Sequence, residues 1–167
     1  VDVHMGRFDF QCIDCHQTED HLIGGRSISV SVDNANQIAC TDCHNERLHS
    51  DQRINAHTDT VACQTCHIPQ VAVHQATKTH WDWSTAGDEY LKSKGSFIYE
   101  KNLKPEFIWY NGTADRYLLG DPLQDDAITP LNHPRGDIRD PDAKIWPFKV
   151  HMAVQPYDTQ FDYLMQP

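Results

Sequence analysis

The 167-residue chain repeats one short motif three times, and the three copies contain all six of its cysteines. The copies are Cys12-Ile-Asp-Cys15-His16, Cys40-Thr-Asp-Cys43-His44 and Cys63-Gln-Thr-Cys66-His67. A Cys-x-x-Cys-His motif is typical of covalent haem attachment. Its two thiols bond to the porphyrin edge, and its histidine binds the iron as the proximal ligand. We therefore predict three covalently bound haem c groups, with the three motif histidines as proximal iron ligands.

A Cys-x-x-Cys pair has two other common uses, as half of a zinc site and as a thiol–disulfide redox motif. A zinc finger adds further cysteines or histidines downstream, and a thioredoxin-type motif normally occurs once, beside a βαβ pattern. Neither use explains the histidine that follows every second cysteine of this chain. Zinc binding and structural disulfides are therefore the weaker alternatives to haem.

The chain is poor in the residues that build a hydrophobic core. Only 39% of its residues are hydrophobic, and its mean hydropathy is −0.63. Porphyrin faces are flat and apolar, so burying them against side chains removes apolar surface from water as burying an aromatic cluster does. We expect folding to depend on haem, and the fold to be a multihaem cytochrome c. Such a fold is mostly irregular, with short α-helices at the motifs, little β-structure, and packed haems at its centre.

The three motifs lie in the first half of the chain. They begin at residues 12, 40 and 63, spacings too short for three separate domains. We expect a trihaem-binding region over residues 1–80 and a haem-free segment over residues 81–167 that wraps the same compact unit. Within that segment, two runs rich in aromatic and β-branched residues flank Lys104-Pro105, which predicts a small hairpin near residues 97–110.

The charge and hydropathy of the chain restrict its partners. The net charge is −10, from 24 acidic and 14 basic residues, which is the opposite of a nucleic-acid binding footprint. No run of about 18 apolar residues is present, so no membrane span is expected. The partners expected are redox proteins, further haem-bearing segments or subunits, or a small sulfur or nitrogen oxyanion. Thioether cytochromes mature outside the cytoplasmic membrane, so a periplasmic or extracellular location is expected, although no secretory signal is visible near Val1.

Eight further histidines are available for the sixth position on each iron. A second histidine gives a six-coordinate electron-transfer haem, whereas a methionine raises the potential. His21 and His49 each follow a motif histidine by five positions, which along a continuing helix is a rotation of about 140°. Each is therefore expected to bind a neighbouring haem instead of its own. The preferred distal candidates are His4, His21, His49, His57 and His151, ahead of His74, His80 and His133.

Eight short strings extend beyond the haem motifs and cover most of the chain. They are Cys63-Gln-Thr-Cys-His-Ile-Pro69, Trp81-Asp-Trp-Ser-Thr-Ala-Gly87, Tyr99-Glu-Lys-Asn102, Trp109-Tyr-Asn-Gly112, Asp115-Arg-Tyr-Leu-Leu-Gly-Asp121, Pro134-Arg-Gly-Asp137, Ala143-Lys-Ile-Trp-Pro-Phe-Lys-Val-His151 and Gln155-Pro-Tyr-Asp158. Taken together, they resemble the octahaem tetrathionate reductase family of c-type cytochromes. The resemblance implies a periplasmic oxidoreductase in which bis-histidine haems feed electrons to one lysine-ligated active-site haem.

The chain departs from that family by having three haem motifs instead of eight. Lys78 and Lys149 lie nearest to the quoted strings, but neither matches the position of the lysine ligand, so no catalytic residue is assigned. We expect electron transfer through three closely packed haems, within a larger multihaem oxidoreductase. Two alternatives stay open: a complete reductase of tetrathionate, nitrite or hydroxylamine, and a subunit of an extracellular cytochrome filament. Whether the chain is itself an enzyme is left open.

Overall fold

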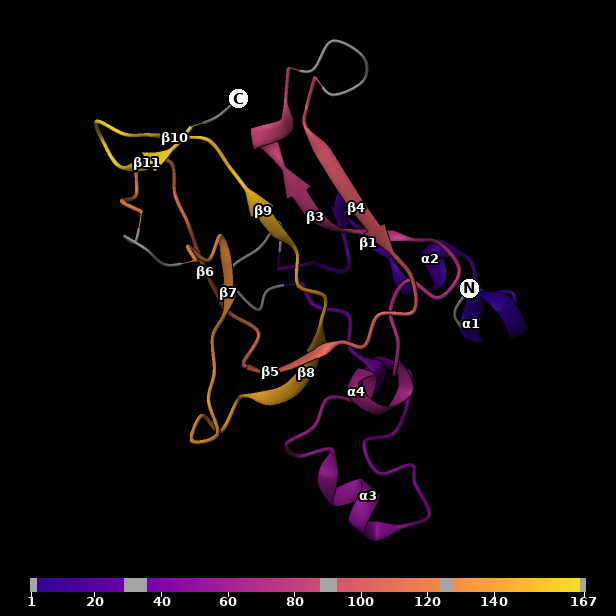
Figure 1. The fold of residues 1–167 in the computed structure, drawn as a ribbon. Helices are drawn as coiled ribbons and strands as arrows, with labels where there is room; N and C mark the ends of the chain where they lie inside the picture. Colours follow the sequence, from indigo (N-terminus) through magenta and orange to yellow (C-terminus); the bar gives the residue numbers. More distant parts are fainter. Residues whose placement is uncertain (1–2, 29–35, 88–92, 124–127, 166–167) are drawn as a thin grey trace.

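Each of the three motifs begins a short helical turn in the computed structural model, which describes residues 3–28, 36–87, 93–123 and 128–165 (Figure 1). The turns are α2 (Cys12–Cys15), the 3₁₀ helix η1 (Cys40–Asp42) and α4 (Cys63–His67). Side chains three and four positions apart share one face of a helix, so each turn brings two thiols and a histidine to the same side. The prediction of short helices at the motifs is confirmed.

Acidic residues inside two of the motifs stabilise these turns. The Asp14 carboxylate accepts a hydrogen bond of 2.6 Å from the backbone N–H of Gln11. The Asp42 carboxylate accepts one of 2.9 Å from the backbone N–H of Ala39. An acidic side chain that caps the first N–H groups of a turn satisfies donors that have no partner within it. The variable positions of these motifs therefore help to form the local structure.

The remaining elements are short helices and small sheets. The helices are α1 (Val3–Arg7), α3 (Gln52–His57) and the 3₁₀ helix η2 (Trp83–Thr85). The strands are β1 (Thr18–Glu19), β2 (Leu22–Ile23), β3 (Thr77–Asp82), β4 (Ser96–Glu100), β5 (Glu106–Tyr110), β6 (Ala114–Arg116), β7 (Asn132–Pro134), β8 (Lys144–Phe148), β9 (Met152–Val154), β10 (Tyr157–Asp158) and β11 (Tyr163–Leu164). Most of the chain is irregular, as expected for a multihaem cytochrome c fold.

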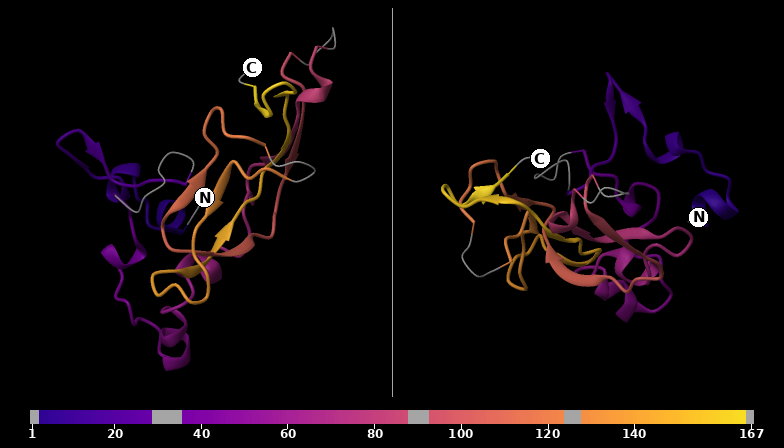
Figure 2. Two further views of the ribbon diagram at one scale, coloured as in Figure 1. Left: turned by 90° about the vertical axis from the view of Figure 1, so that its left-hand side faces the viewer. Right: turned by 45° about the horizontal axis from the view of Figure 1, so that its top comes forward.

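Within the described residues, the strands form one three-stranded sheet and four two-stranded ones. The larger sheet has the order β4-β3-β9, with β3 antiparallel to β4 and parallel to β9. The pairs are β1–β2, β5–β8, β6–β7 and β10–β11, all antiparallel. In the left view of Figure 2, the indigo and purple N-terminal segment with its helices lies to one side of the orange and yellow later strands.

The predicted hairpin near residues 97–110 is wrong, although both of its strands exist. β4 pairs with β3, and β5 pairs with β8. Leu103, between the two strands, is held by Val71 through backbone hydrogen bonds of 2.9 and 3.0 Å, and Asn102 has a positive φ of 54°. The connecting chain is therefore bound by a segment from the first half of the sequence and turns β5 away from β4.

Strand β8 joins the third motif to the second half of the chain. The carbonyl of Ile145 accepts hydrogen bonds from the backbone N–H of Ala62, at 3.0 Å, and from the Thr65 hydroxyl, at 2.7 Å. Lys144 donates from Nζ to the carbonyl of Thr58 at 2.6 Å. Because Ala62 and Thr65 flank and enter α4, these bonds fix the third motif against a strand about 80 residues later.

The chain buries very little of its own apolar surface. Among the described residues, the buried hydrophobic side chains are Ala62, Tyr110, Ala114 and Ala143, and no large side chain is fully buried. The accessible surface is 12912 Å², whereas a folded protein of this mass exposes about 8,400 Å². Ile13 and Leu22, near the first motif, are 73% and 71% exposed. The protein atoms alone therefore leave a large apolar area for another group to cover.

Candidate haem-binding sites

His16, in the first motif, is held in the form that a metal ligand requires. Its Nδ1 lies 2.7 Å from the carbonyl oxygen of Gly24. A carbonyl only accepts hydrogen bonds, so Nδ1 must carry the proton and donate it. The Nε2 lone pair of a neutral imidazole is then free for iron, and a carbonyl on the other nitrogen orients the ring, as is usual for metal-bound histidine.

His44, in the second motif, faces a histidine from the start of the chain. The ring centroids of His4 and His44 are 6.0 Å apart, and their planes are tilted by 57°. Two imidazoles that bind one metal from opposite sides, with metal–nitrogen distances of about 2 Å, have centroids about 6 Å apart. His4 lies on α1, and Phe10 contacts its ring at a centroid distance of 5.6 Å. The spacing of this pair fits one iron between two imidazoles.

His67, in the third motif, has the same relation to His49. Their ring centroids are 6.0 Å apart, with planes only 26° from parallel. The Asn55 side chain clamps the backbone of His49, accepting from its N–H at 3.0 Å and donating to its carbonyl at 2.7 Å. The Nδ1 of His49 is buried without a hydrogen-bond partner, a costly arrangement unless another group meets it. This second pair also fits a haem iron.

Asn55 lies on α3. Asp51 caps the first turn of this helix by accepting a hydrogen bond from the backbone N–H of Arg53 at 2.8 Å.

Replacing Asn55 with alanine removes both hydrogen bonds to His49. Each lost partner of a partly buried polar group costs roughly 1–3 kcal/mol, so we expect the free energy of unfolding to fall by about 2–4 kcal/mol. Chemical denaturation of Asn55→Ala checks this. The matched control is Arg53→Ala, since the Arg53 side chain is exposed and its one hydrogen bond within the described part of the chain is to Asp51. Equal losses in the two variants would contradict the role of Asn55.

The second and third motifs meet at their first cysteines. Burial raises the pKa of the Cys40 thiol, and the Cys63 thiol, which lies within hydrogen-bonding reach, raises it further. All six cysteines are free. Free thiols are what thioether formation needs, and porphyrins attached at two thiols in contact would have their edges close together.

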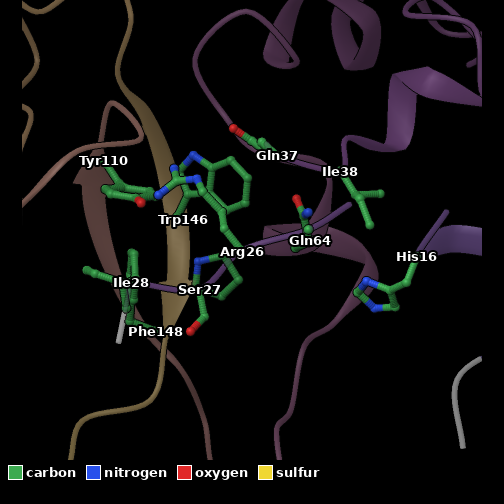
Figure 3. A pocket seen from close by; sticks show the side chains of 12 residues that line it. His16, Arg26, Ser27, Ile28, Gln37, Ile38, Gln64, Tyr110, Trp146 and Phe148 are labelled. Carbon is green, nitrogen blue, oxygen red and sulfur yellow. The ribbon is translucent and has the colours of Figure 1, made fainter. Parts of the chain in front are cut away.

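A cavity of about 290 Å³ lies between the first motif and the β5–β8 pair. Figure 3 shows His16 and Ile38 at one end, with Tyr110, Trp146 and Phe148 at the other. The ring of Tyr110 packs edge to face against the other two, with centroid distances of 5.8 Å to Trp146 and 5.3 Å to Phe148. Aromatic side chains provide large apolar contact areas, so this wall suits a porphyrin held by the first motif.

The other three distal candidates have no such ring contact with a motif histidine among the described residues. His21 lies exposed in the turn between β1 and β2, with a φ of 66°. His57 is the exposed last residue of α3. Burial lowers the pKa of His151, and Lys149, Lys78 and His80 lower it further, which favours the neutral imidazole. The structure therefore brings together His4 and His49 with motif histidines, and leaves the partner of His16 open.

The premise of a helix continuing past each motif is wrong. α2 ends at Cys15 and η1 ends at Asp42, because the chain then leaves helical geometry, with Cys43 at φ −122°. The expectation that His49 binds a neighbouring haem stays a prediction, and the chain path that places it beside His67 is irregular. Sequence reasoning missed Asn55 and Gly24, which act through backbone contacts that no motif reveals.

Both candidate lysines make contacts within the chain. Lys78 Nζ lies over the ring of Phe97, 3.8 Å from its centroid, and 4.4 Å from that of Trp81. Lys149 Nζ donates to the carbonyl of Lys78 at 2.8 Å. Cation–π contacts and a backbone hydrogen bond account for these ammonium groups locally.

Comparisons with known proteins agree with this geometry. Residues 1–79 match the family model described as cytochrome c7 and related cytochrome c, and residues 78–167 match the model described as bacterial cytochrome c. The solved octaheme cytochrome c from Shewanella oneidensis is 46% identical over 99% of this chain, with a TM-score of 0.91. The chain belongs to the multihaem c-type cytochromes. It spans 41% of that relative, and the comparison with curated proteins gave no match.

Membership in the multihaem c-type cytochromes implies covalently bound haem c with iron, and electron transfer as the general role. The residues of this cytochrome fit that cofactor on three observations: the ligand-ready form of His16, the two histidine pairs at 6.0 Å, and the uncovered apolar surface. None of the described helices is long and apolar enough to cross a membrane.

Proposed function

We propose that the chain is a three-haem electron-transfer module. The observation that carries the proposal is the pair of histidine contacts, His4 with His44 and His49 with His67, each at a centroid distance of 6.0 Å. When bound, each haem supplies an iron that exchanges one electron. Histidine on both faces of an iron suits electron transfer more than substrate binding, since neither axial position is left open.

The protein's own residues perform three tasks in this proposal. The six cysteines tether the porphyrins, with Cys40 and Cys63 in contact. His16, His44 and His67 would hold the three irons, and His4 and His49 would supply a second histidine ligand to two of them. His21, His57 and His151 are the remaining candidates for the partner of His16. The aromatic wall and the exposed aliphatic side chains exclude water from the cofactors and lower the local dielectric constant.

The proposal is tested by counting haems and their ligands. The polypeptide mass of the chain is 19.2 kDa, and the expected intact mass is that of the polypeptide plus three haems. Near-infrared magnetic circular dichroism should then show bis-histidine ligation for at least the two haems of the second and third motifs. Fewer than three haems, or high-spin iron at those motifs, would overturn the proposal.

A larger assembly is favoured by the length of the relative. The chain covers 41% of the octaheme cytochrome, so we propose that it supplies electrons to a multihaem oxidoreductase whose active-site haem is bound elsewhere. Export to the periplasm or the cell exterior is part of this proposal, because thioether attachment takes place there. Reduced chain mixed with tetrathionate, nitrite or hydroxylamine should stay reduced. Rapid oxidation by one of them would instead favour the self-contained reductase.

A further inference from the structure

The turn that follows the first motif is anchored on both sides. Gly24 donates from its backbone N–H to the carbonyl of Gln17 at 2.8 Å, and Gly25 donates to the carbonyl of Asn36 at 2.9 Å. The Asn36 side chain in turn donates to the carbonyl of Ile23 at 2.5 Å. The Gly24 carbonyl that receives the proton of His16 is therefore fixed by hydrogen bonds to segments before and after it.

Gly25 lies directly against the imidazole of His16. A Cβ atom at Gly25 would come within 2.8 Å of Nδ1 and 2.9 Å of Cε1 of that ring, and within 3.0 Å of Cδ1 of Ile38. Contacts under 3 Å require something to move. Gly25 also has a φ of 105°, a conformation that side chains rarely adopt. Only glycine at position 25 lets the backbone come close enough to the His16 ring for Nδ1 to donate to the Gly24 carbonyl.

We propose that Gly25 is a positioning residue for His16, and that the close approach it permits sets the reduction potential of the haem bound by the first motif. A hydrogen bond from the second ring nitrogen makes the imidazole a more basic ligand, which favours ferric iron and lowers the potential. The inference rests on the proposed function in one respect, namely that His16 binds iron.

The test compares Gly25→Ala with Gly120→Ala. Gly120 has a φ of 92°, close to that of Gly25, but a Cβ atom there meets nothing within 4 Å. Both variants therefore carry backbone strain, but only the new methyl group of Gly25→Ala would collide with the His16 ring.

In Gly25→Ala we expect three attached haems by intact mass, and one of three midpoint potentials raised. Loss of such a ligand-orienting contact typically weakens metal binding by about tenfold or more. A tenfold loss of ferric relative to ferrous affinity raises the potential of a one-electron couple by about 59 mV. The electron paramagnetic resonance signal of the same haem should also change. The Gly120→Ala control should keep all three potentials. The inference would be overturned if the three midpoint potentials of Gly25→Ala were unchanged, or if one potential of Gly120→Ala rose by the same amount.

If Gly25→Ala does not fold, a measurement on the unaltered protein tests whether the Nδ1 proton of His16 is held by the Gly24 carbonyl. The Nδ1 proton of His16 should exchange with water more slowly than the ring protons of His133, which lies exposed on β7. Equally fast exchange would overturn the inference. Failure of the proposed function looks different, because the first motif of the unaltered protein would then carry no histidine-bound haem at all.

Discussion

A variant with Cys63 and Cys66 both replaced by alanine is expected to lose one haem and its cooperative unfolding transition. The third motif has the strongest ties to the rest of the chain, through the Ile145 carbonyl on β8. Exposing even ~300 Å² of apolar surface costs about 7 kcal/mol, which is comparable with the whole stability of a typical domain, about 5–15 kcal/mol. Intact mass and differential scanning calorimetry measure the two effects.

The matched control is the variant with Cys12 and Cys15 replaced by alanine. It removes the same number of thiols, but α2 and the residues around it, 9–22, are all exposed. We expect this variant to lose one haem as well, with a lower melting temperature and a transition that remains cooperative. Similar calorimetric traces for the two variants would show that the bonds of α4 to β8 do not make the third motif central to the fold.

The second large effect is expected from His49→Ala. If His49 and His67 share one iron, this variant leaves that iron with a single histidine, so one of the three haems should change from low spin to high spin and begin to bind carbon monoxide. Its potential should rise by ~0.1 V, a fraction of the ~0.8 V range that axial ligands span. Magnetic circular dichroism and redox titration report both changes.

Two further histidine variants make this test specific. His133→Ala removes an exposed imidazole on β7, where His133 lies opposite Asp115, and all haems should stay low spin. His57→Ala removes a distal candidate on α3 that has no ring contact with a motif histidine among the described residues. A high-spin haem in His57→Ala together with unchanged spectra in His49→Ala would show that the pairing of His49 with His67 is wrong.

Several features of the site followed from local sequence because they depend on neighbouring residues. The spacing of Cys12, Cys15 and His16 fits one helical turn whatever the rest of the chain does, since residues three and four apart share a face. The low apolar content predicted a protein without its own core, and the small buried set of the structure agrees with it. The family resemblance was also visible in the sequence, and the comparison with the octaheme cytochrome confirms it.

Pairings across long distances in the chain could not be read in this way. Composition predicts strands at 97–100 and 107–110, but their partners are β3 and β8, because Val71 binds the connecting residue Leu103. Strand propensity is a property of each run, whereas pairing depends on which other edge is within reach.

The sequence by itself determined the cofactor chemistry: three sets of two thiols and a histidine, each closed by hydrogen bonds within four residues. Only the tertiary structure decided which histidine faces which motif and how His16 is oriented. His4 meets His44 across 40 residues, and His49 meets His67 across 18. His49 and Gly24 both lie in irregular chain, where the Asn55 side chain holds the backbone of His49 and the Gly24 carbonyl orients His16. Irregular backbone has no periodicity in the sequence, so the positions that it brings together become visible only when the fold is known.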